Sequence, residues 1–223
     1  MLRKDKDAYD ALRMKYAGTP SLFFVNHPHW AVMDTVPDDL VVCSDVRFVE
    51  VCNNGSVFPV PKGLPDDGWG NDRFWDAVNA SRARRGLPLL FGLASDDTHF
   101  YPNGRDGAPT ESGSPGDGYI RVRAESLTPE SLFAAMNRGD FHASSGVDLE
   151  DVSFADGTLS VSVVPKEGVS HTIRFIVSKR DFGEPRIVGT KTYPDDRTRV
   201  LALPGPGVGV TVKTVAGDRG KPV

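Results

Sequence analysis

The first part of the chain alternates between helical and strand-like spacings of hydrophobic residues. Ala8, Leu12 and Tyr16 recur at helical spacing, and the pattern stops at Gly18, which predicts a helix over residues 5–17. Apolar runs of strand length follow at residues 21–26, 47–52, 89–95 and 119–122. Strands that are apolar throughout and separated by helices are typical of a parallel sheet covered on both faces. The pattern therefore predicts an α/β fold, and both an open sheet and a barrel are compatible with it.

Two further helices are indicated between these strands. One starts at residue 71 or 72 and ends at Gly86. The other begins with Thr128, Pro129 and Glu130, which offer an N-cap, a first-turn proline and a first-turn acid. We expect this helix to end at Gly139, because glycine is the residue that most readily adopts the left-handed conformation after a helix.

The pattern changes near residue 150. All three Trp, both Cys and all four Met precede that point. The remaining residues are rich in Val, Gly, Pro and Thr, with strand-like runs at residues 159–164, 171–178, 199–203 and 208–215 and no helical period. We therefore expect two domains, an α/β domain over residues 1–150 and a small all-β sandwich over residues 151–223.

Polar residues gather where three of the predicted strands end. The first strand runs into Asn26 and His27, the second into Asn53, and the third into Asp97 and His99. Because the carboxyl ends of parallel strands meet at one edge of a sheet, these side chains are expected to share one site.

The third strand end carries a metal-binding pattern. Asp97 and His99 lie on the same side of an extended segment, and imidazole with carboxylate suits Zn, Mn or Fe(II). The alternative is that Asp97 caps a turn and His99 is a surface residue. His27 precedes Pro28, which favours an extended backbone there. His29 shares a face with His27 if the chain stays extended, and is a rim residue if Pro28 begins a turn.

Other candidates have supporting roles. Glu50 lies within an apolar strand, where an unpaired carboxylate is costly, so it needs a metal, a histidine ligand or a basic helix end as its partner. His142 and Ser145 follow a predicted helix and either return to the mouth of the site or are ordinary turn residues. The glycine- and proline-rich segment 100–118 indicates a lid or substrate loop, with a disordered insertion as the alternative.

The composition of the chain limits the classes of partner that it is expected to bind. The 223 residues have a net charge of −4, with 39% hydrophobic and 25% charged residues, which is typical of a globular chain. There is no signature for duplex nucleic acid and no apolar run long enough to span a membrane.

We expect Arg82, Arg84 and Arg85 to form a solvated helix end. We expect Cys43 and Cys52 to be buried thiols, with one bridge as the alternative. The first residues lack the apolar core of a signal peptide, which slightly favours the cytoplasm and leaves an upstream signal open.

At this point the sequence resembles a known family. Residues 26–28 (Asn-His-Pro), 48–55 (Phe-Val-Glu-Val-Cys-Asn-Asn-Gly) and 94–99 (Ala-Ser-Asp-Asp-Thr-His) resemble, in that order, the later motifs of PHP-domain metallohydrolases (polymerase and histidinol phosphatase). The helix at 127–138, with the segment Gly-Asp-Phe-His-Ala-Ser-Ser-Gly at 139–146, resembles the end of that domain in its larger members.

The resemblance carries several implications. It implies a distorted (β/α)7 barrel over about residues 10–150, with two or three Zn, Mn or Fe ions at its carboxyl end and hydrolysis of phosphoesters or, in some branches, of carbamates and other esters. By position, His27, Asp97 and His99 match metal ligands, and Glu50 and Asn53 match recurrent positions without an assigned role. Asp97 would hold the attacking water or bridge the ions, which makes it the expected catalytic residue.

The departure from the family is at the amino-terminal side. The family begins with a His-x-His motif, whereas no histidine precedes His27. We therefore expect a partial barrel, from either a fragment or a gene product lacking part of the fold, and weak or no activity of this chain alone.

The expected function is metal-dependent hydrolysis of a small phosphoester. The alternative is a non-catalytic binding module in which a degenerate barrel presents the sandwich to carbohydrate or to a protein. A measurement of metal content separates the two.

Overall fold

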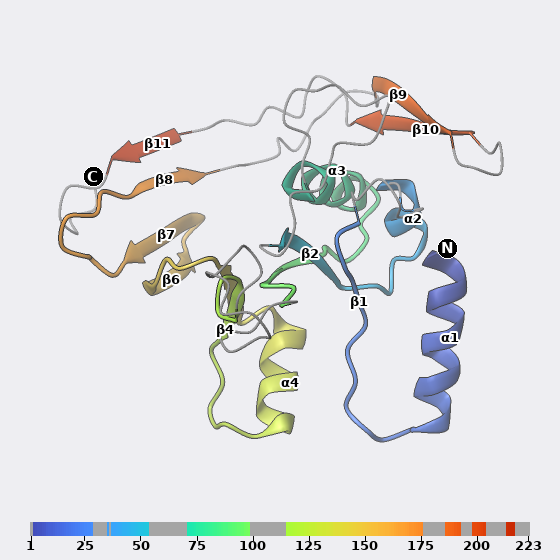
Figure 1. The fold of residues 1–223 in the computed structure, drawn as a ribbon, viewed down its shortest axis with the longest axis horizontal. Helices are drawn as coiled ribbons and strands as arrows, with labels where there is room; N and C mark the ends of the chain where they lie inside the picture. Colours follow the sequence, from blue (N-terminus) through green and yellow to red (C-terminus); the bar gives the residue numbers. More distant parts are fainter. Residues whose placement is uncertain are drawn as a thin grey trace, which may run out of the picture.

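A parallel three-stranded sheet forms the centre of the molecule. The computed structural model describes residues 2–28, 35, 37–53, 71–98, 115–175, 186–192, 198–203 and 213–216. Strands β1 (Phe24–Val25), β2 (Phe48–Asn53) and β3 (Phe91–Ser95) pair in the order β1–β2–β3 (Figure 1). The predicted mixed α/β fold with a parallel sheet is therefore confirmed. The described strands form no closed barrel, and β1 is much shorter than the apolar run at 21–26 suggested.

One face of this sheet is covered by two helices. Helix α2 (Pro37–Val42) packs against α3 (Asn71–Arg84), and α3 packs against β2. Their buried side chains form one core with Val25 and Val49 of the sheet, and its other members are Leu40, Val41, Cys43, Val46, Phe74, Val78 and Leu90. Val25 and Val49 are direct partners in the β1–β2 register, so they face the same side of the sheet.

The opposite face is covered over β3 by aromatic packing. Phe48, Phe91 and Phe141 contact one another with ring centroids 5.7–6.1 Å apart. Phe141 opens β5 (Phe141–Ser144), which follows α4 (Pro129–Arg138). Phe24 pairs with Phe48 in the register, yet it remains 49% exposed. The second face is thus well covered at β3 and much less at β1.

Strand β4 (Tyr119–Val122) differs from the sequence-based expectation. It pairs antiparallel with β5 rather than joining the parallel sheet. The physical reason lies in its composition, because Arg121 is exposed at its centre and the remaining side chains are only half-buried. A strand that keeps a charged side chain in solvent fits a two-stranded ladder better than a sheet that is buried on both faces.

Helix α4 begins and ends where its capping residues predict. The Thr128 side chain accepts a hydrogen bond from the Ser131 N–H, and Gly139 has a φ of +82° with its N–H bonded to the Met136 carbonyl. A Cβ on Gly139 would lie 2.5 Å from the Phe91 ring, so this position needs glycine for space as well as for conformation.

The remaining strands pair as three separate antiparallel ladders. They are β6 (Leu149–Ala155) with β7 (Thr158–Val163), β8 (Thr172–Phe175) with β11 (Lys213–Ala216), and β9 (Arg186–Thr192) with β10 (Thr198–Leu203). The expected strand character is present, and the described residues after 150 contain no helix. The β6–β7 ladder leaves most of its side chains exposed, Phe154 by 72%. The described residues show small antiparallel ladders, and their assembly into a sandwich stays a prediction. The boundary expected at residue 150 falls inside β6.

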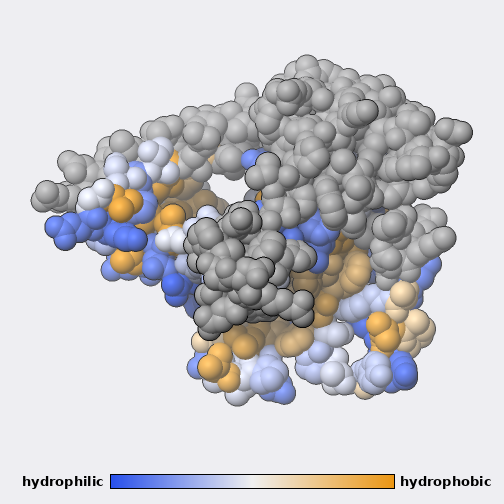
Figure 2. All heavy atoms as spheres, viewed as in Figure 1, coloured by the Kyte–Doolittle hydropathy of each residue, from blue (hydrophilic) through white to orange (hydrophobic). Residues whose placement is uncertain are grey.

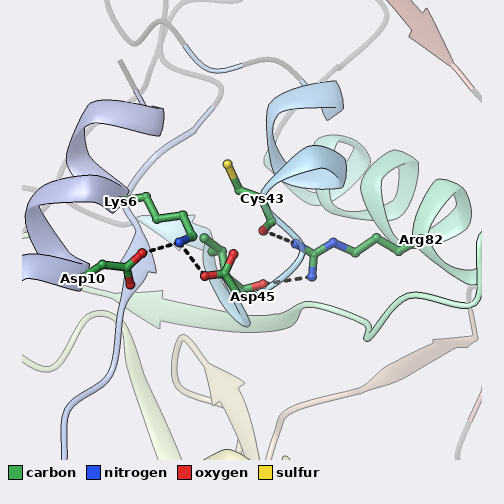
Figure 3. Close-up of polar contacts among 6 residues, drawn as sticks. Lys6, Asp10, Cys43, Asp45 and Arg82 are labelled. Carbon is green, nitrogen blue, oxygen red and sulfur yellow. Dashed lines mark hydrogen bonds and ion pairs between the residues drawn. The ribbon is translucent and has the colours of Figure 1, made fainter. Parts of the chain in front are cut away.

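Arg82 corrects a sequence-based interpretation. Instead of lying on a solvated helix end, its side chain is fully buried, with an exposed fraction of 0%. Its guanidinium donates to the carbonyls of Leu40, Cys43, Val46 and Pro88, at 2.5–2.9 Å. Figure 3 shows the bond to the Cys43 carbonyl. These five bonds use every N–H of the group and satisfy carbonyls at the end of α2. Burial, followed by the charge of Arg47, lowers the pKa of Arg82 to about 10, so it stays charged at neutral pH.

A second charged group ties the first helix to this core. Lys6 of α1 (Leu2–Lys15) bonds Asp10 at 2.5 Å and Asp45 at 2.7 Å (Figure 3). Burial alone would raise the pKa of the Asp45 carboxyl, but its hydrogen bonds and the positive charges of Lys6 and Arg82 together hold it below the ordinary value. The Lys6–Asp45 pair therefore links α1 to the segment that Arg82 binds.

No helix among the described residues has the length and apolar character that crossing a bilayer requires.

Candidate functional site at the carboxyl ends of the parallel strands

Glu50 joins the carboxyl ends of all three parallel strands. It is 3% exposed and accepts hydrogen bonds from the His27 backbone N–H at 2.5 Å and from the Asn53 amide at 3.2 Å. The Ser95 hydroxyl donates to its second oxygen. His27 follows β1, Asn53 ends β2 and Ser95 ends β3, so one carboxylate connects the three strand ends.

The charge of Glu50 is not neutralised by a described cation. Its three donors are a backbone N–H, an amide and a hydroxyl, and no Lys or Arg of the described residues bonds to it. Burial, followed by this carboxylate, raises the pKa of the Cys52 thiol. Cys52 and Cys43 are both free thiols, so the bridge considered as an alternative is absent. Among the described residues, the strand ends therefore hold a buried carboxylate whose donors are all neutral.

Two predicted ligands have an unusual backbone conformation. Outside glycine, the described residues with positive φ are His27 at +27°, Asp97 at +48° and Asp156 at +51°. Asp156 occupies the Asp-Gly turn between β6 and β7, where such a conformation is common. His27 and Asp97 instead follow strands, and the extended backbone expected at both residues is therefore wrong. In such a place the left-handed conformation costs about 1–3 kcal/mol and is found preferentially at functional sites.

The backbone is also irregular at the end of β2. The register between β2 and β3 shifts between Glu50 and Cys52, so one residue is added on the β2 side. Such bulges re-aim side chains and are frequent beside active sites. Here the bulge directly follows the residue that joins the three strand ends.

A returning segment closes over the end of β3. The Gly116 N–H donates to an Asp96 carboxylate oxygen at 2.8 Å, and this bond, followed by that of Thr98, lowers the pKa of Asp96. Gly118 approaches so closely that a Cβ would lie 2.2 Å from the Ser95 carbonyl oxygen. Residues 115–118 therefore end the expected lid or substrate loop beside the strand ends. Most of that loop lies outside the described residues.

The other predicted site residues are less closely connected. Asn26 is exposed beside His27, and His29 and His99 lie outside the described residues. Ser145 is exposed after β5, and no hydrogen bond among the described residues joins it to Glu50. His142 pairs with Arg121 in the β4–β5 ladder, where burial and then the charge of Arg121 lower its pKa. The structure thus gathers His27, Glu50 and Asn53, places Asp97 beyond Ser95, and leaves His142 in a different charged environment.

A metal at this edge would need more than the described ligands. Among the described residues, no three His, Cys, Asp or Glu side chains are grouped so that they could hold a metal ion. His27 and Asp97 offer an imidazole nitrogen and a carboxylate oxygen, which fit Zn, Mn or Fe(II). His99, the third predicted ligand, lies outside the described part. The chemistry of the residue types therefore fits a transition metal, and the described set is incomplete.

Ser95 is the member of this cluster that sequence reasoning missed. Asn53 and Ser95 are direct partners in the β2–β3 register. Asn53 lies three residues after Glu50 on the same strand, and Ser95 lies on the neighbouring strand. A polar residue ending the strand beside a buried glutamate could have been found as the required partner. The sequence predicted a metal, a histidine ligand or a basic helix end as the partner of Glu50. In the structure its partners are neutral hydrogen-bond donors.

Replacing Glu50 with Gln is expected to lower the free energy of unfolding by about 1–3 kcal/mol, because the amide group turns one acceptor oxygen into a donor facing a donor. Urea denaturation measures the change. Glu150→Gln, an exposed residue of β6, is the matched control. Equal stability of the two variants would contradict the role of Glu50 in joining the strand ends.

Comparison with protein-family models, with curated proteins and with solved structures gave no match to this chain. The assignment to a function therefore depends on the strand-end geometry and on the motifs themselves.

Proposed function

We propose that this protein is a metal-dependent hydrolase of phosphoesters, with its site at the carboxyl ends of β1, β2 and β3. The observation that carries the proposal is the joining of three strand ends by buried Glu50, with His27 and Asp97 beside it in left-handed backbone conformations. The proposal includes a partial barrel of the PHP type, followed by a tail that completes a β-sandwich.

Three residues are proposed to hold the first metal ion, namely His27, Asp97 and His99. A bound Zn, Mn or Fe ion would supply a nucleophilic water at neutral pH and would neutralise charge on the phosphoryl oxygens. Glu50 does not reach the substrate in this proposal. It fixes the backbone of His27 through the 2.5 Å hydrogen bond, and through Ser95 it fixes the strand end that leads to Asp97.

Asp97 has the central role in this arrangement. Its carboxylate would bind the metal and accept a hydrogen bond from the attacking water, so that the water faces the phosphorus atom. Asp96 has a different role in this proposal. Its carboxylate accepts a hydrogen bond from the Gly116 N–H and so fixes the returning segment at the mouth of the site.

The direct test is metal-dependent hydrolysis of p-nitrophenyl phosphate. We expect the chain stripped of metal with a chelator to be inactive, and added Mn²⁺ or Zn²⁺ to raise the rate at least about tenfold above the metal-free background. The rate should fall again when excess chelator is added. Because three ligands hold one ion rather than a pair, the activity is expected to be modest.

Two results would contradict the proposal. The first is hydrolysis that is equally fast with and without chelator. The second is an absence of hydrolysis with every metal, together with binding of a polysaccharide or a protein partner by the metal-free chain, which would support the non-catalytic binding module instead.

A further inference from the structure

A cavity of about 820 Å³ lies at the other end of the sheet from the strand-end site. Its floor contains Val46 and Phe48, where β2 begins, and its walls come from α1, from residues 16–23 and from Phe133 and Asn137 of α4. Figure 2 shows apolar residues gathered on the hollowed surface between α4 and α1. The volume is within the range of about 300–1,000 Å³ that small-molecule sites occupy.

The cavity presents flat aromatic surface. The rings of Tyr9 and Phe23, which both line it, stack with centroids 4.8 Å apart and an angle of 28° between their planes. The Tyr9 hydroxyl donates to the Ser21 carbonyl, which fixes the ring against the following segment. Tyr16 and Phe133 add two more aromatic side chains to the lining. A planar apolar molecule would find preformed rings to stack on.

Positive charge remains in this lining after the ion pairs are formed. Lys6 is bonded to both Asp10 and Asp45, which are the acidic residues of the lining. The two other cations, Arg13 and Arg47, make no ion pair with a carboxylate of the described residues.

Both guanidinium groups are instead oriented by aromatic rings. The guanidinium carbon of Arg13 lies 5.7 Å from the centre of the Tyr9 ring, and that of Arg47 lies 5.0 Å from the centre of the Phe91 ring. Arg47 also donates through Nε to the Leu89 carbonyl at 3.3 Å, which leaves its terminal N–H groups for another acceptor. Stacked guanidinium groups with free donors are suited to a carboxylate or a phosphate.

From these features we propose that the cavity between α1 and α4 binds a small planar aromatic anion, an aryl carboxylate or an aryl phosphate. The aromatic body would stack beside Tyr9 and Phe23, and the anionic group would bind Arg13 and Arg47. This site is separate from the proposed hydrolytic site, because β2 runs about 17 Å from Phe48 at the cavity to Asn53 at the strand ends. The inference does not depend on the proposed function.

The test uses 2-naphthoate as the probe and 2-naphthylmethanol as the neutral control of the same shape. Titration calorimetry with the full chain is expected to show one site for 2-naphthoate and about tenfold weaker binding of the alcohol. Arg13→Gln and Arg47→Gln are each expected to weaken binding of 2-naphthoate severalfold. Arg85→Gln, an exposed residue after α3, is the matched control and should leave the affinity unchanged.

A second variant blocks the space rather than the charge. Ala17 lines the cavity and is exposed, so Ala17→Trp fills the cavity without entering the core. Loss of 2-naphthoate binding in this variant, with an unchanged denaturation curve, supports the proposal. Equal affinity for the acid and the alcohol, unchanged binding in both arginine variants, or no binding by the native chain would overturn it. Self-association of the chain through this face would also overturn the proposal, in favour of a protein partner. Light scattering would show it as an oligomer that persists when 2-naphthoate is added.

Discussion

Replacing Arg82 with Lys is expected to lower the free energy of unfolding by about 3–5 kcal/mol, because a buried group that uses five donors is exchanged for one with three. The lysine ammonium cannot reach the carbonyls of Leu40, Cys43, Val46 and Pro88 together. At least one buried carbonyl would lose its partner, and the ammonium charge would be less well hydrogen-bonded than the guanidinium. The variant keeps the charge, so the loss reports on geometry.

Urea denaturation followed by circular dichroism measures this change. Arg85→Lys is the control, because Arg85 is exposed at the end of the same helical segment. We expect the control to stay within about 0.5 kcal/mol of the native chain. If the two variants unfold at the same urea concentration, Arg82 does not hold α2 and the segment before β2 together.

The Asp97→Asn variant is expected to reduce metal-dependent hydrolysis of an aryl phosphate at least about tenfold, to the metal-free background, because a neutral amide replaces a charged metal ligand. The fold should be retained. Asn has nearly the same volume and, like Asp, tolerates the left-handed backbone conformation that Asp97 adopts at a φ of +48°.

Asp156→Asn is an unusually close control for this variant. Asp156 also has a left-handed conformation, at a φ of +51°, but it lies in the turn between β6 and β7. Both variants should have the native denaturation midpoint, while only Asp97→Asn loses kcat/KM. A similar loss in both variants, or none in either, would remove Asp97 from the proposed catalytic role.

The features that sequence predicted well depend on local chemistry. The ends of α4 follow from Thr128 and Gly139 alone, because a capping side chain and a left-handed glycine act within one turn. The convergence of strand ends follows from the parallel sheet, since it needs only that apolar strands alternate with helices. These predictions required no knowledge of what packs against what.

The features that it missed depend on distant partners. Arg82 is far from Leu40 and Cys43 in sequence, and nothing near Arg82 distinguishes a buried guanidinium from the exposed one of Arg85. The pairing of β4 with β5 joins two strands that α4 separates in the sequence, so the residues around β4 do not identify its partner. Similarly, the partners of Glu50 come from two other strands, so the need for a partner was predictable and its identity was not.

Titration of the metal-stripped chain with Zn²⁺, followed by calorimetry, tests the proposed metal site most directly. We predict saturable binding of one ion per chain, which His27→Gln and Asp97→Asn each weaken by at least about tenfold while Asp156→Asn leaves it unchanged. Absence of saturable binding by the native chain, or equal affinity in all three variants, would contradict a metal site at the ends of β1, β2 and β3.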